Sequence, residues 1–161
     1  MVAALQDVTG FRGEKIVELC LTDYSAFSRA LFRPAFLGDK WPSIDFYVEL
    51  MALPRKTPYF FIQAKTTSST LRPASRALRV STRASDIEHL LRIPGPTYLF
   101  GVHELSHRVF VRSVHSGVPL KAITRISLSN ELTSEKLRLL YDEVKAFWKG
   151  VDHKPKSSVF L

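Results

Sequence analysis

The sequence predicts a mixed α/β domain arranged around an antiparallel hairpin. Three observations predict this class: apolar and polar residues alternate over residues 44–50, apolar residues recur at helical spacing over residues 137–148, and the chain has 161 residues. A period of two is typical of strands, a period of 3.6 is typical of helices, and roughly 100–200 residues is the usual length of one domain. We therefore expect a single domain over residues 1–161, in the order helix, three strands, helix, two strands, helix.

The first helix is expected over about residues 11–30, where apolar residues follow helical spacing. Glu14 lies on the side of this helix that faces away from the apolar stripe. Residues 31–37 then form a short apolar run that contains Pro34. Proline cannot donate a hydrogen bond to a sheet ladder, so this run favours an edge strand.

The central hairpin is expected over residues 44–65. In its first strand, residues 44–50, one face carries Ile44, Phe46, Val48 and Leu50, and the other carries Asp45, Tyr47 and Glu49. A proline-bounded loop, residues 53–58, joins this strand to residues 59–65. Gln63 and Lys65 share one face of that second strand.

The second half of the chain alternates loops with short elements. Residues 66–84 are rich in Ser, Thr and Arg and are expected to form a basic loop. The pattern Ser85-x-x-Glu88 is typical of a capping box and opens a helix that ends near Arg92, before Pro94. Strands are expected over residues 97–102 and 108–114.

The last helix is expected to begin at Thr133 or Ser134 and to end near residue 150. Its apolar stripe comprises Leu137, Leu140, Tyr141, Val144, Phe147 and Trp148. We expect this stripe to belong to the core, although an aromatic-rich terminal helix could also cover a second copy of the chain. Residues 152–161 are expected to form a frayed tail.

Composition and cysteine usage narrow the class of protein. The chain is 45% hydrophobic and 24% charged, which are the values of an ordinary globular protein. The longest apolar runs fall far short of the roughly 20 residues that span a bilayer, and the N-terminus lacks a secretory pattern. Cys20 is the single cysteine and is expected to be an inert core residue. We therefore expect a cytoplasmic protein without a membrane partner.

The positive charge of the chain points to a polyanionic partner. There are 23 Lys and Arg against 15 Asp and Glu, a formal net charge of +8. A field of this sign attracts nucleic acid. The candidate contacts are Arg72, Arg76, Arg79 and Arg83 in the basic loop. The alternative for these arginines is a solvated loop that keeps the protein soluble.

The chemistry-bearing residues gather at the hairpin. Asp45 and Gln63 lie on neighbouring strands, and Lys65 ends the second one, so their side chains can converge at one end of one sheet face. Mg²⁺ prefers oxygen ligands, which the Asp45 carboxylate, the Gln63 side chain and the Ala64 backbone carbonyl could supply, with Glu14 contributing from the first helix. Lys65 could then orient a water and offset charge on a phosphorus-bound oxygen.

Ile44-Asp45 followed by Ile62-Gln63-Ala64-Lys65 resembles the signature of the PD-(D/E)xK, or restriction-endonuclease-like, nuclease superfamily. The Gln-x-Lys form is similar to the Mrr-like restriction enzymes and to a related bacterial family known only as a domain of unknown function. Residues 10–14, Gly-Phe-Arg-Gly-Glu, are similar to a Gly-x-x-Gly-Glu-like element on the first helix of those chains. The resemblance covers about residues 10–115.

This resemblance implies a fold and an activity. The fold is a restriction-endonuclease-like αβββαβ core, with a central mixed sheet flanked by helices. The activity is a metal-dependent endonuclease that uses Mg²⁺ or Mn²⁺ to hydrolyse phosphodiester bonds, in DNA rather than RNA, within bacterial defence or a mobile element. The implied catalytic residues are Glu14, Asp45, Gln63 and Lys65, and the implied metal ligands are Glu14, Asp45, Gln63 and Ala64.

Two departures from the signature keep other functions open. Ile44 replaces the usual proline, and Gln63 replaces the second acid, which removes one negative charge from the metal ligands. The alternative is a catalytically inactive module of the same fold that binds nucleic acid or an acidic partner protein. A zinc-like cluster at His103, Glu104 and His107 is not favoured, because nothing completes it at a recognisable spacing. A homodimer is left open, since a two-fold pair could cut both strands of a duplex.

Overall fold

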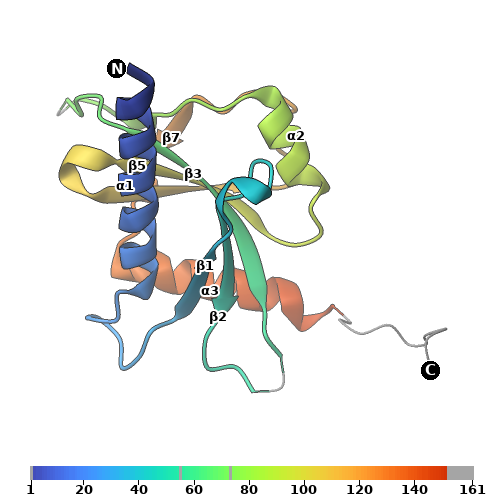
Figure 1. Ribbon diagram of the computed structural model, residues 1–161. Coiled ribbons are helices and arrows are strands. Elements are labelled where there is room, and N and C mark those ends of the chain that lie inside the picture. Colours follow the sequence, from blue (N-terminus) through green and yellow to red (C-terminus); the bar gives the residue numbers. More distant parts are fainter. Residues whose placement is uncertain (1, 55, 73, 152–161) are drawn as a thin grey trace.

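Five strands form one mixed sheet with helices packed on it in the computed structural model (Figure 1). The structure describes residues 2–54, 56–72 and 74–151, without the side chains of residues 2–7 and 39. The α-helices and strands are α1 (Val2–Thr22), β1 (Phe32–Phe36), β2 (Phe46–Leu50), β3 (Tyr59–Thr67), β4 (Ala77–Arg79), α2 (Ala84–Arg92), β5 (Thr97–His103), β6 (Arg108–Val114), β7 (Arg125–Ser127) and α3 (Ser134–Lys149).

The main sheet has the strand order β1-β2-β3-β5-β6. Strands β1, β2 and β3 form an antiparallel meander, β3 and β5 pair in parallel, and β5 and β6 are antiparallel. The parallel pair needs a crossover, which β4 and α2 supply. The mixed α/β class is confirmed, and the α-helices and the five strands of the main sheet follow the expected order of helix, three strands, helix, two strands and helix.

Two short strands were missed by the sequence analysis. β4 lies in the expected basic loop and pairs with β7 to form a separate two-stranded sheet, the β4–β7 ribbon. The expectation that residues 66–84 form only a loop is therefore wrong. Each strand has three residues, which is too short for an alternating pattern to stand out.

Two apolar clusters fill the two faces of the main sheet. The first joins alternate residues of β3 and β5, such as Phe60 and Phe100, to buried residues of α1 and α3. The second joins Leu99 of β5 to buried residues of α2 and of the β4–β7 ribbon. Successive strand residues point to opposite faces. The covering elements therefore divide as α1 and α3 on one face, and α2 and the ribbon on the other.

The first helix is displaced from its expected bounds. α1 begins at Val2 and ends at Thr22, whereas the sequence analysis placed it over about residues 11–30. The chain leaves the helix where the Asp23 carboxylate accepts a hydrogen bond from the Ser25 amide at 2.8 Å, a local turn that competes with further helix. Within the described residues, no helix combines the length and the apolar character needed to cross a bilayer.

Three other local expectations are corrected. α2 is capped by the Asp86 carboxylate, which accepts from the Arg83 amide at 3.1 Å, so the expected Ser85-x-x-Glu88 capping box is wrong. Ile44 precedes β2 and packs in the second cluster rather than with its expected face. Phe147 is 49% exposed, so the buried stripe of α3 is narrower than expected. The expected frayed tail, 152–161, lies outside the described residues.

Candidate active site

The candidate site lies where β3 extends beyond its neighbour β2. The β2–β3 ladder starts at the pair Phe46 and Ile62, whereas β3 continues to Thr67 and remains paired with β5 on its other side. In the described sheet, the last residues of β3 thus have no strand beside them on the β2 side. Their backbone groups on that side are available to side chains or to a ligand.

Asp45 occupies the beginning of this open edge. Its amide donates to the Ile62 carbonyl at 2.8 Å, and its carbonyl accepts from the Leu37 amide at 2.9 Å. Its carboxylate accepts from the Ala64 amide at 2.6 Å, as a backbone carbonyl of β2 would. The carboxylate is therefore held in line with the sheet, beside the residue between Gln63 and Lys65.

The carbonyl of Ala64 points to the same edge as its amide, because both groups of one strand residue face the same neighbour. The carboxylate of Asp45 and the carbonyl of Ala64 therefore face the same open edge.

α1 brings Glu14 to the same edge from the first face of the sheet. A Cβ on Gly13 would lie 1.8 Å from Thr66 Oγ1 and 2.8 Å from Thr66 Cβ, so the helix reaches β3 only because residue 13 is glycine. Glu14, Ala64, Lys65 and neighbouring residues of β3 line one hollow of about 460 Å³. α1 and the end of β3, which are 51 positions apart at Glu14 and Lys65, thus line one hollow.

Gln63 approaches from the opposite face. It is the register partner of Leu99, which packs in the second cluster, and it is only 2% exposed. Its Oε1 atom has no hydrogen-bond partner in the described part of the chain. Leaving a buried acceptor unpaired costs about 1–3 kcal/mol, so such an atom is commonly satisfied by a bound ion or water.

The donor set fits a hard divalent cation. Two carboxylates, one amide oxygen and one backbone carbonyl, from Glu14, Asp45, Gln63 and Ala64, are the oxygen donors that Mg²⁺ prefers. Over the described residues, no three His, Cys, Asp or Glu side chains gather as a metal-binding group. Gln63 is an amide rather than an acid, so a cation held there would be bound with less negative charge.

Asp86 is a buried acid beside the site that the sequence analysis missed. Its carboxylate accepts hydrogen bonds from the Ser43 hydroxyl at 2.9 Å and from the Arg83 amide at 3.1 Å. Burial opposes its ionisation, but those hydrogen bonds and the positive charges of Lys65 and Arg83 outweigh burial and lower the pKa of Asp86 below its ordinary value. Only its position at N3 of a helix could have indicated it from sequence.

Replacing Asp86 with Asn is expected to reduce the loss of unfolding free energy that the protein shows as the pH falls. Because folding lowers the pKa of Asp86, its carboxylate stabilises the folded protein above the unfolded pKa, and this contribution is lost as the pH falls through the folded value. Denaturant unfolding between about pH 6 and pH 3 measures the difference. Asp142→Asn, at a half-exposed position paired with Arg138, is the control. Parallel profiles for wild type and Asp86→Asn would contradict this role.

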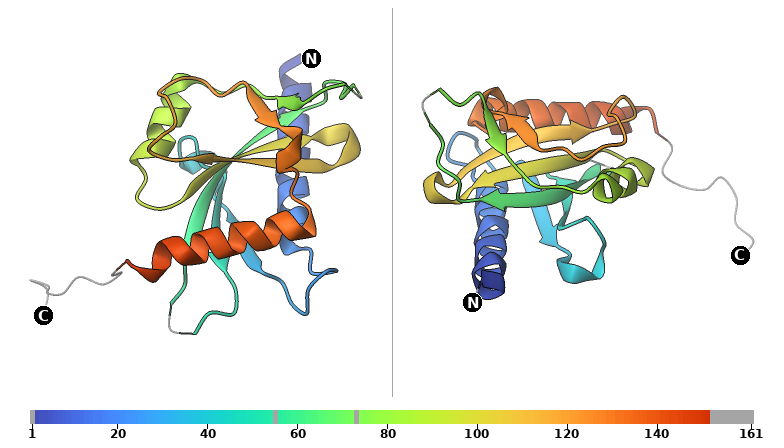
Figure 2. Two further views of the ribbon diagram at one scale, coloured as in Figure 1. Left: turned by 180° about the vertical axis from the view of Figure 1, so that it is seen from behind. Right: turned by 90° about the horizontal axis from the view of Figure 1, so that it is seen from above.

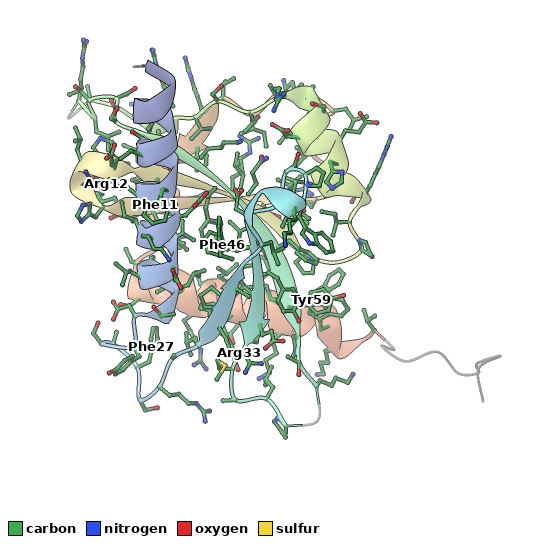
Figure 3. The ribbon with its side chains drawn as sticks, in the orientation of Figure 1. Phe11, Arg12, Phe27, Arg33, Phe46 and Tyr59 are labelled. Atoms are coloured by element: carbon green, nitrogen blue, oxygen red, sulfur yellow. The ribbon has the colours of Figure 1, made fainter. Side chains whose placement is uncertain are left out.

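The other titratable candidates have partners within the fold. His103 uses both ring nitrogens, with Ser106 Oγ at 2.6 Å and the Ser69 carbonyl at 3.0 Å. Glu104 pairs with Arg12 at 3.2 Å. Arg12 is labelled beside α1 in Figure 3. Burial, followed by the charges of nearby acids, raises the pKa of Cys20 to about 11, as expected for an unreactive thiol.

The four arginines expected to contact nucleic acid occupy different places. All of them are exposed. Arg79 lies in β4, and Arg76 precedes it. Arg72 lies in the turn before the ribbon, its carbonyl accepting from the Ser75 amide at 2.8 Å. Arg83 lies apart from the others, at the N-terminus of α2, where its guanidinium is 3.8 Å from the Asp86 carboxylate.

Comparison with known proteins adds no relatives. No protein-family model matches the sequence, and no curated protein matches it.

Proposed function

We propose that this protein is a Mg²⁺-dependent nuclease of the restriction-endonuclease-like, PD-(D/E)xK class that hydrolyses phosphodiester bonds in DNA. The observation that carries the proposal is the position of the Asp45 carboxylate, 2.6 Å from the backbone amide of Ala64, the residue between Gln63 and Lys65. Glu14 lines the hollow at the same edge. The element order, with a meander followed by a helical crossover to a parallel strand, supports the αβββαβ core of that class.

The residues at this edge would have different roles in catalysis. Asp45 and Ala64 would hold the cation, with Glu14 and Gln63 completing its oxygen ligands. When bound, such a cation polarises a phosphoryl oxygen and makes water a better nucleophile. Lys65 donates to the attacking water or to a non-bridging phosphate oxygen, and so orients the water and offsets the negative charge that grows on phosphate.

The test is incubation with supercoiled DNA, linear DNA, single-stranded DNA and RNA, each with Mg²⁺, Mn²⁺ or a chelator. We expect cleavage of DNA with either metal and none with the chelator. Cleavage that survives the chelator would refute the metal-dependent mechanism, and no cleavage of any substrate would refute the enzyme.

A second candidate is a non-catalytic module that binds nucleic acid or an acidic protein. The observation that favours it is Gln63, which is 2% exposed and lacks the negative charge of an acid. Binding of DNA without cleavage, together with no calorimetric signal from Mg²⁺ or Mn²⁺, would support this module.

A further inference from the structure

We propose that the outer face of the β4–β7 ribbon is a surface that binds the phosphate backbone of a nucleic acid beside Lys65. The surface consists of Arg79 of β4, Arg125 of β7 and the adjoining Arg112 of β6. The inference rests on the proposed function for the identity of its ligand. It assigns binding to Arg112 and Arg125, which the sequence pattern did not single out.

Two arginines of the ribbon point outward because successive residues of a strand face opposite sides. Leu78 and Ile126 are a register pair, are 1% and 0% exposed, and point into the second apolar cluster. The next pair along the ribbon, Arg79 and Arg125, consequently points away from the sheet, and both residues are exposed. Arg112 joins them, because its Nη1 atom donates to the Arg125 carbonyl at 3.2 Å.

This arrangement of charge is unfavourable in the protein alone. Like charges directly opposite each other on an antiparallel pair destabilise it. Arg12, Arg33, Arg83, Arg92, Arg108 and Arg138 each form an ion pair with an acid. Among the residues that the structure describes, Arg79, Arg112 and Arg125 form none. An external polyanion would relieve the repulsion, and guanidinium groups match phosphate oxygens in a two-pronged geometry.

The ribbon also lies next to the candidate site. Lys65 of β3 is the register partner of Gly101 of β5. A Cβ at Gly101 would lie 2.8 Å from Leu78 Cδ2 and 2.9 Å from Ile126 Cδ1, so the ribbon rests directly on this glycine. The ribbon and the N-terminal half of α1 lie at the same end of the molecule, opposite the loop between β2 and β3 (Figures 1 and 2). A backbone bound on the ribbon would therefore pass beside the open end of β3.

The experiment measures binding of a short labelled duplex by fluorescence anisotropy in the presence of chelator, which excludes metal-dependent cleavage. The double variant Arg79→Ala/Arg125→Ala is compared with Arg29→Ala/Lys56→Ala, two exposed residues outside the ribbon that remove the same charge. The logarithm of the binding constant falls linearly with the logarithm of the salt concentration, and each phosphate contact contributes about 0.9 to the slope. Losing two contacts therefore weakens binding about 60-fold at about 0.1 M salt and lowers the slope by about 2. The control is expected to stay within about twofold.

Single-stranded DNA and RNA probes identify which phosphate backbone is preferred, and poly-glutamate serves as a competitor. Unchanged affinity in the ribbon variant, an equal loss in the control, or competition by poly-glutamate as strong as by DNA would each overturn the inference. Ribbon-dependent binding by a protein that cleaves nothing would sustain it while refuting the proposed function. If cleavage requires Lys65 but the ribbon variant cleaves and binds as the wild type does, the proposed function would stand and this inference would be refuted.

Discussion

Replacement of Lys65 with Ala is expected to lower metal-dependent DNA cleavage by roughly 100- to 10,000-fold, the usual contribution of a positioned group that transfers a proton or stabilises charge. Lys65 lines the hollow it shares with Glu14 and is only partly buried, so its removal leaves the core intact. Cleavage rates at saturating Mg²⁺, with thermal unfolding as a check on folding, measure the effect.

Lys56→Ala is the matched control for this experiment. Lys56 is exposed in the loop at the opposite end of the hairpin and loses the same charge. We expect its cleavage rate to equal that of the wild type. Wild-type cleavage by Lys65→Ala would remove Lys65 from the mechanism, and an equal loss in both variants would attribute the effect to net charge.

Gly13→Ala is expected to give the largest loss of stability among single substitutions near the site. The new methyl group would overlap Thr66, with all three nearest atoms of that side chain within 2.9 Å. Rotation of Thr66 cannot remove its Cβ from the contact, so α1 must move away from β3. Overpacking of this kind costs about 1–3 kcal/mol, and the displacement carries Glu14 away from the end of β3.

Gly10→Ala provides the control within the same helix. Among the described residues, no atom apart from the chain neighbours and nearby helix backbone lies within 4 Å of a Cβ at Gly10, so the substitution should stabilise α1 by roughly 0.5–1 kcal/mol. Denaturant unfolding of both variants measures the free energies. Equal stability of the two variants would contradict the close approach of α1 to β3, and with it the placement of Glu14 at the open edge.

The elements with strong periodicity could be predicted from sequence. The hairpin of β2 and β3, strands β5 and β6, and α3 from Ser134 follow patterns that local burial imposes, and each lies where expected within a few residues. The proximity of the site residues in the hairpin could be predicted, because antiparallel pairing places residues on either side of the connecting loop opposite one another. The pairing of Phe46 with Ile62 places Asp45 beside the start of the Gln63-to-Lys65 segment.

The features that were missed depend on contacts distant in sequence. β4 and β7 are strands only because residues 77–79 meet residues 125–127, and neither segment carries a pattern of its own. Gly13 resembled part of a motif, but its contact with Thr66 gives it a packing role that no local rule indicates. Asp86 could not be placed beside Ser43, 43 residues away, without the fold.

The most direct test of the candidate site is calorimetric titration of Mg²⁺ and Mn²⁺ into wild type and Asp45→Asn. The asparagine side-chain oxygen can still accept from the Ala64 amide, so the variant is expected to fold while losing the charge that holds a cation. We expect the wild type to bind one cation and Asp45→Asn to lose that binding, with unfolding temperatures nearly equal. Equal cation binding by the two proteins, or none by the wild type, would contradict a metal site at the open edge of β3.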